Sequence, residues 1–272
     1  MKYGYFDQEK REYVIDRVYV PTSWTNYLGV EDLAAVVNHT AGGYLFYKSP
    51  EHHRITRFSP NGVPMDRPGH YIYLRDDDTG EYWSVSWQPC GGPLEDYRCR
   101  HGLSYSVYEC AGHGINAAQT LFIPRGEAVE LWDLALENTS GRKRRLSVYS
   151  YAEFSYHQIP IDNQNFQMSL YCSGSEYEDG IIDYELFYEH AHQFMAASFD
   201  PDGFDCLRDS FLGPYRTESN PLAVERGACF SSFEKGGNHC AVLQKRLTLA
   251  PGGKTRLIWM LGEGGLEEGR RV

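Results

Sequence analysis

The 272-residue sequence lacks the patterns of exported, membrane-spanning and nucleic-acid-binding proteins. Residues 1–7 carry a lysine with no apolar segment behind it, so we expect neither a signal peptide nor a membrane span, and a cytoplasmic location. The net charge of -11 and the pI near 5.4, with a single short basic run at residues 142–145, argue against a nucleic-acid partner. We expect that run to be a solvated start of a strand.

Cysteine, metal and nucleophile motifs are equally scarce. The seven cysteines form no C-x-x-C pair and their number is odd, which favours reduced thiols. No G-x-S-x-G elbow, phosphate-binding loop or marked pair of carboxylates is present, so the sequence predicts no catalytic residue in this chain. We also expect no bound cofactor.

Two segments invite a metal-site interpretation. His190 and His192 would share one face of a strand and could begin a metal site, but surface histidines on an edge strand explain them better. Residues 200–205 resemble a calcium loop without its spacing or its bidentate glutamate, and a turn between strands is the simpler interpretation. We therefore expect no metal site.

The residues that are present favour β-structure. Hydrophobic residues make up 42% of the chain and aromatic residues 14%, with 21 tyrosines, and short alternating segments are separated by Gly, Pro, Asn and Asp. Such strands must hide one face against a second sheet, which predicts a large antiparallel β-sandwich with little helix. The predicted strands are residues 12–20, 43–48, 70–75, 82–87, 104–109, 115–123, 128–137, 145–154, 181–188, 193–199, 240–249 and 255–261.

Turn residues predict three hairpins, at residues 76–80, 138–141 and 251–253. Residues 30–38 fit a short helix and a strand equally well. The apolar pattern stops near residue 262, and residues 263–272 read as a linker.

Residues 162–168 place four acids or amides in a row, after the turn at Pro160. A loop capped by its own side chains and a loop that contacts sugar hydroxyl groups are both consistent with this composition.

Ten short blocks of sequence stand out along the chain, at residues 1–7, 11–15, 24–29, 41–47, 54–57, 67–71, 100–106, 153–154, 162–168 and 208–213. In their sequence and order they resemble the phosphorylases of glycoside hydrolase family 94, in which cellobiose and N,N'-diacetylchitobiose phosphorylases are found. Residues 75–78 and 163–171 look closer to the chitobiose branch than to the cellobiose branch.

The resemblance implies an inverting phosphorolysis, in which inorganic phosphate is a co-substrate and a β-linked disaccharide yields an α-sugar 1-phosphate and a sugar. It implies a galactose-mutarotase-like supersandwich over residues 1–262 and the start of a truncated linker at 263–272. The (α/α)6 catalytic domain would be absent, and the sandwich would be silent alone. It also implies a homodimer in which a loop of one subunit reaches its neighbour's substrate, with Gln167 as the substrate-binding residue and Asn165 as its companion.

Two functions from other classes stay open. A stand-alone carbohydrate-binding module would present an exposed aromatic platform, whereas a phosphorylase domain would expose an apolar patch where its catalytic barrel docks. A complete small hydrolase would need a pair of catalytic carboxylates, which the sequence does not mark.

Overall fold

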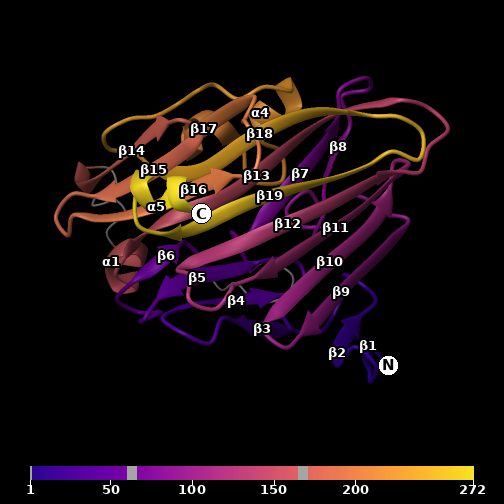
Figure 1. The fold of residues 1–272 in the computed structure, drawn as a ribbon, viewed down its shortest axis with the longest axis horizontal. Coiled ribbons are helices and arrows are strands. Elements are labelled where there is room, and N and C mark those ends of the chain that lie inside the picture. The colour runs from indigo at the N-terminus through magenta and orange to yellow at the C-terminus, as the bar shows by residue number, and fades with distance from the viewer. Residues whose placement is uncertain (1, 60–65, 165–170) are drawn as a thin grey trace.

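The computed structural model describes residues 2–59, 66–164 and 171–272, and they form two large antiparallel sheets (Figure 1). The ten-stranded sheet runs in the order β1-β2-β9-β10-β11-β12-β19-β16-β15-β14. Its strands are β1 (Gly4–Asp7), β2 (Glu12–Ile15), β9 (Asp96–Gly102), β10 (Tyr105–Gly112), β11 (Ile115–Phe122), β12 (Val129–Asn138), β14 (Ser173–Glu178), β15 (Ile181–Leu186), β16 (Ala191–Ala197) and β19 (Lys254–Glu263).

The second sheet has nine strands, and its main path is β17-β18-β13-β6-β5-β4-β3, with β7 and β8 attached beside β13. Its strands are β3 (Thr25–Leu28), β4 (Leu33–Asn38), β5 (Gly43–Tyr47), β6 (Arg54–Thr56), β7 (Tyr71–Asp76), β8 (Tyr82–Ser84), β13 (Arg144–His157), β17 (Gly203–Leu207) and β18 (His239–Leu249). The predicted class, a large antiparallel β-sandwich, is confirmed, and the open segment at residues 30–38 contains strand β4.

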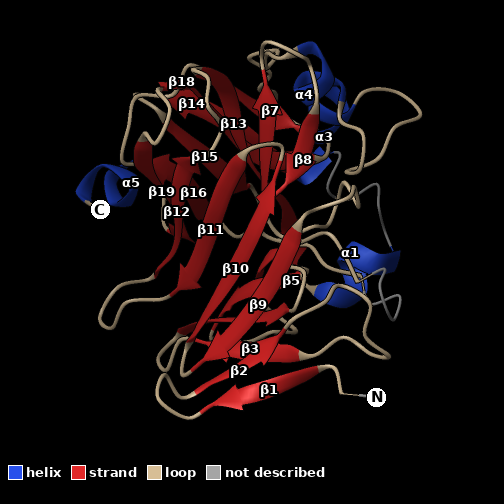
Figure 2. Ribbon diagram, turned by 90° about the vertical axis from the view of Figure 1, so that its right-hand side faces the viewer, coloured by secondary structure: helices blue, strands red, loops and turns tan. Residues whose placement is uncertain are grey.

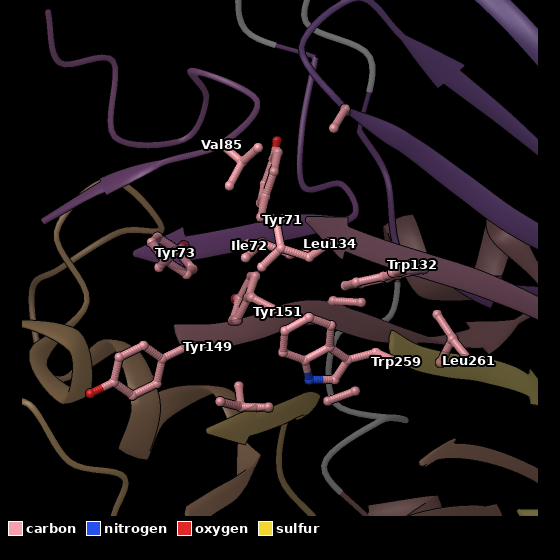
Figure 3. Close-up of a cluster of buried hydrophobic side chains, with 14 of the residues drawn as sticks. Tyr71, Ile72, Tyr73, Val85, Trp132, Leu134, Tyr149, Tyr151, Trp259 and Leu261 are labelled. Carbon is pink, nitrogen blue, oxygen red and sulfur yellow. The ribbon is translucent and has the colours of Figure 1, made fainter. Parts of the chain in front are cut away.

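Aromatic side chains fill the space between the sheets (Figure 3). Trp132 of β12 and Trp259 of β19 are fully buried on the inner face of the ten-stranded sheet. The Trp259 indole N–H donates to the backbone oxygen of Leu243 in β18, 3.3 Å away in the opposite sheet. Burial of these large rings stabilises the core, and the Trp259 indole keeps a hydrogen-bond partner there.

Strand β13 is buried along nearly its whole length because both of its faces are covered. Toward the ten-stranded sheet, the Ser150 hydroxyl lies 3.2 Å from the sulfur of Met195. On the other face, Phe211 of helix α3 (Arg208–Leu212) stacks on Tyr151 with a 5.2 Å centroid distance. Because both faces are covered, the polar residues Ser150 and Glu153 of this strand are also buried.

Two of the three predicted hairpins are wrong. Residues 76–80 do join the antiparallel pair β7 and β8, but residues 138–141 and 251–253 each carry the chain from one sheet to the other. The Asn138 side-chain amide donates to the backbone oxygens of Arg142, Leu249 and Ala250, so one side chain ties both crossings together. Asn and Gly suit such an arc as well as a hairpin turn.

Within the described residues, four short helices lie outside the sheets, namely α1 (Ile159–Gln164), α3, α4 (Leu222–Arg226) and α5 (Leu266–Arg271). Figure 2 shows α5 on the side of the ten-stranded sheet and the other three on the opposite side. Leu266 of α5 packs on an apolar cluster that includes Ile181 and Phe194, within the segment expected to be a linker. The domain boundary at residue 262 stays a prediction.

Several surface expectations need correction. Arg144, expected in a solvated strand start, is only 3% exposed and pairs with Asp76. Strand β16 lies between β15 and β19, so His192 is not on an edge strand. His190 lies before this strand and has a positive φ. Among the described residues, no helix has the length and apolarity needed to cross a membrane, and no three His, Cys, Asp or Glu side chains are grouped to bind a metal. All seven cysteines are free.

Candidate functional site

The two residues singled out from the sequence, Asn165 and Gln167, lie outside the described residues. The chain that leads to them is described. It includes helix α1, in which two contacts fix the side chain of Asp162. The Arg57 guanidinium donates to both of its carboxylate oxygens, at 3.1 and 2.8 Å, and the Ser155 hydroxyl lies 3.4 Å from one of them. A bidentate pair of this kind fixes the orientation of both side chains.

A polar cavity of about 450 Å³ lies next to Asp162. It lies among Glu153 of β13, Asp162 of α1, Arg208 of α3 and the segment that follows β6. The lining residues are Arg57, Ser59, Arg67, Pro68, Glu153, Asp162, Arg208, Thr217, Glu218 and Asn238.

Charged side chains form a continuous network around this cavity. Glu153 of β13 is at its centre, with one oxygen 2.9 Å from Arg208 Nε and the other 3.6 Å from Arg57 Nη1. The Tyr151 hydroxyl also donates to Glu153, at a distance of 2.5 Å. Arg208 continues to Glu218 with an Nη2–Oε1 distance of 3.1 Å. The cavity is therefore lined by alternating charges.

Burial alone would lower the pKa of the Arg57 guanidinium, but its hydrogen bonds to Asp162 and the charge of Glu153 raise it above the ordinary arginine value. The same balance holds at Arg208, where Glu153 and Tyr151 outweigh desolvation. Nearby, burial and the Arg57 charge lower the pKa of His239 to about 4, so that imidazole is neutral at pH 7.

The described part of this network consists of charges that pair with one another. Three arginines face three carboxylates, so the lining has no net charge to attract phosphate or a metal ion. The described lining also holds no nucleophile beside a free base. The strongest local effect of the network is to fix the start of α1, and thereby the segment that leads to residue 165.

The calcium-like segment at residues 200–205 is the predicted turn, since it joins β16 to β17. Asp205 is buried and accepts hydrogen bonds from the backbone of Phe230 and from the backbone and hydroxyl of Ser232. Burial raises the pKa of this carboxyl although those hydrogen bonds oppose the shift. The carboxylate therefore caps a loop of its own chain.

The family model that matches this chain is the glycosyl hydrolase 94 supersandwich domain, over residues 11–271. The chain belongs to this family. A relative from Vibrio proteolyticus, an N,N'-diacetylchitobiose phosphorylase, is 53% identical over 97% of this chain and 34% of its own length. The chain thus spans about a third of the curated relatives that it matches first.

Solved structures agree on the fold of this supersandwich. One named for kojibiose phosphorylase, from the human microbiome, has a TM-score of 0.53 at 9% identity, and covers 99% of this chain and 34% of that one. An aldose 1-epimerase-like protein of Escherichia coli K12 has a TM-score of 0.51 at 11% identity, and covers 90% of this chain and 100% of that one. Both confirm the mutarotase-like sandwich and nothing about activity.

The family blocks in the sequence converge on the cavity. Arg57, Arg67, Glu153 and Arg208 each come from a different block that carries the resemblance, and all four line it. None of these four residues was assigned a role from the sequence. The available signal was that each of these distant blocks holds at least one charged residue.

Proposed function

We propose that this chain is the N-terminal sandwich domain of a disaccharide phosphorylase that cleaves N,N'-diacetylchitobiose with inorganic phosphate. The observation that carries the proposal is the 53% identity to the Vibrio proteolyticus phosphorylase over nearly the whole chain. In this proposal the phosphate site and the acid that protonates the leaving sugar lie in a separate catalytic domain, so the sandwich is silent alone. Phosphate attacks the anomeric carbon as the acid protonates the leaving oxygen, and this single displacement inverts the configuration.

The sandwich has a supporting role in this proposal. Residues 1–262 form the domain, residues 263–272 lead toward the catalytic domain, and the protein is a cytoplasmic homodimer. Gln167, with Asn165 beside it, contacts the disaccharide bound to the neighbouring subunit. The ion pair of Arg57 and Asp162 supports this arrangement, because it fixes helix α1 just before those residues.

The proposal is tested with a chimera in which this chain replaces the matching third of the Vibrio proteolyticus relative. We expect the chimera to release sugar 1-phosphate from N,N'-diacetylchitobiose in phosphate buffer, and more slowly from cellobiose, while the 272-residue chain alone releases none. Gln167→Ala in the chimera should lower activity, and Gln164→Ala is the matched amide control. Turnover by the chain alone would overturn the proposal.

A further inference from the structure

A second groove, distant in sequence from the charged cavity, lies where the two sheets end side by side. Strand β1 is the edge of the ten-stranded sheet and β3 is the edge of the nine-stranded sheet. Between them is a hollow of about 560 Å³, a size typical of small-molecule sites. The residues lining it are Phe6, Arg11, Glu12, Tyr13, Trp24, Thr25, Asn26, His101, Gly102 and Leu103.

Three aromatic rings form the wall of this groove. Phe6 and Tyr13 are direct partners across the β1–β2 ladder, and their ring centroids are 4.8 Å apart at an interplanar angle of 67°. Trp24 meets Tyr13 at 5.3 Å and 61°. Edge-to-face packing uses the edge of one ring and leaves other ring faces uncovered. Phe6 is 71% exposed although it is a large apolar side chain.

The polar residues around the rings are mostly committed to the fold. Glu12 accepts from the Tyr105 hydroxyl at 2.7 Å and lies 3.6 Å from Arg100 Nη1. Burial lowers the pKa of His101 to about 4, so it is neutral, and Asn26 donates to the backbone oxygens of Gly102 and Tyr105. The groove therefore presents aromatic faces with little net charge.

This chemistry selects one class of ligand. Pyranose rings carry an apolar C–H face that packs on aromatic rings and hydroxyl groups that bond to polar neighbours, whereas phosphate or an acidic chain needs positive charge. Arg11 at the rim is exposed and can donate to a sugar oxygen. We propose that this groove is a carbohydrate-binding site for a β-linked pyranoside; the choice of N,N'-diacetylchitobiose as its ligand rests on the proposed function.

The test is titration of the 272-residue chain with N,N'-diacetylchitobiose and cellobiose, followed by backbone amide NMR shifts and by tryptophan fluorescence. We expect saturable shifts confined to β1, β2 and residues 24–26 and 101–103, with binding in the millimolar range. Phe6→Ala should weaken binding about tenfold, since one ring face is lost. Tyr27→Ala is the matched control, because Tyr27 is 70% exposed but does not line the groove, and it should bind like the wild type.

Two outcomes overturn the proposal. One is the absence of shifts in the groove at sugar concentrations of tens of millimolar, or equal effects of the two variants. The other is a concentration-dependent dimer in sedimentation that Phe6→Ala dissociates while no variant binds sugar, which would make the groove a protein interface. Phosphorolysis by the chimera enters neither readout, so failure of the proposed function leaves this test intact.

Discussion

Replacing Asp76 by asparagine removes a buried negative charge at the end of β7, opposite Leu146 near the start of β13 and just after the crossing at residues 138–141. Asp76 is 1% exposed, and its Oδ2 lies 2.7 Å from Nη2 of Arg144, which is itself 3% exposed. A second arginine, Arg142, reaches the same oxygen at 3.0 Å but is half exposed. The other carboxylate oxygen accepts the backbone N–H of Asp78 at 2.8 Å.

The expected cost of Asp76→Asn follows from burial. Removing one partner of a buried ion pair leaves the other charge uncompensated and typically costs about 3–5 kcal/mol. Arg142 adds little, because exposed pairs contribute about 0–1 kcal/mol. Asparagine keeps one acceptor, so we expect a loss of about 3 kcal/mol in the free energy of unfolding at pH 7.

Urea unfolding followed by tryptophan fluorescence measures this loss. Asp78→Asn is the control, since Asp78 pairs with Arg145, which is 63% exposed, and should cost less than about 1 kcal/mol. If Asp76→Asn also costs less than about 1 kcal/mol, the buried pair does not stabilise the crossings and our reasoning is refuted.

The pH dependence gives a second check on Asp76. Burial acts to raise the pKa of this carboxyl, but the Asp78 backbone hydrogen bond and the charges of Arg144 and Arg142 lower it overall. A carboxyl with a lowered folded-state pKa stabilises the fold above its unfolded pKa of about 4, and that contribution is lost as pH falls through the folded value. The difference between wild type and Asp76→Asn should therefore shrink in acid.

Three further predictions concern stability. Gly69→Ala should cost about 1–3 kcal/mol in urea unfolding, because the added Cβ would lie 2.0 Å from the Ala41 oxygen; a cost near zero would mean that this backbone can move apart. Phe211→Ala should lower the free energy of unfolding by about 3–5 kcal/mol, since the ring is fully buried against Tyr151, and should leave sugar binding in the groove unchanged. A Tm within about 2–4 °C of wild type, which corresponds to about 1 kcal/mol, would contradict this. Burial lowers the pKa of His101 and of His239 to about 4. The free energy of unfolding should therefore be highest above the unfolded-state pKa of about 6.5, and below it should fall by up to about 1.4 kcal/mol per pH unit for each histidine. A free energy of unfolding that stays constant from about pH 7 to 5, or a slope that is unchanged in His239→Gln, would refute the assignment.

Several strands match the predicted segments closely. β11 differs from its segment by one residue at one end, and β12 and the mostly buried β7 each differ by one residue at both ends, because alternation and short apolar runs are local information. β9 also alternates but was missed. Its outward residues include Arg98 and Arg100, and the inward Tyr97 and Cys99 are too few to show a period against that charge.

The pairing of strands depends on contacts that local sequence does not show. The turns at residues 76–80 and 138–141 look alike as sequence, yet one closes a hairpin and the other leaves its sheet. The difference lies in contacts distant along the chain, such as the Asn138 amide with the backbone oxygen of Leu249. Loop composition cannot report a partner more than a hundred residues away, so register and sheet membership need the whole fold.

The two candidate sites also differ in how far they depend on contacts between residues distant along the chain. Asp162 stood out as a member of an unusual polar run, but its partner Arg57 lies 105 positions away and carries no local mark. The aromatic groove is closer to being readable, since Phe6 and Tyr13 face each other across one short hairpin. Trp24 completes it only because the edge strands of two different sheets end together. Sites made within a hairpin are thus open to prediction from sequence, whereas sites made by sheet edges or by distant ion pairs depend on the topology that the pairing of strands decides.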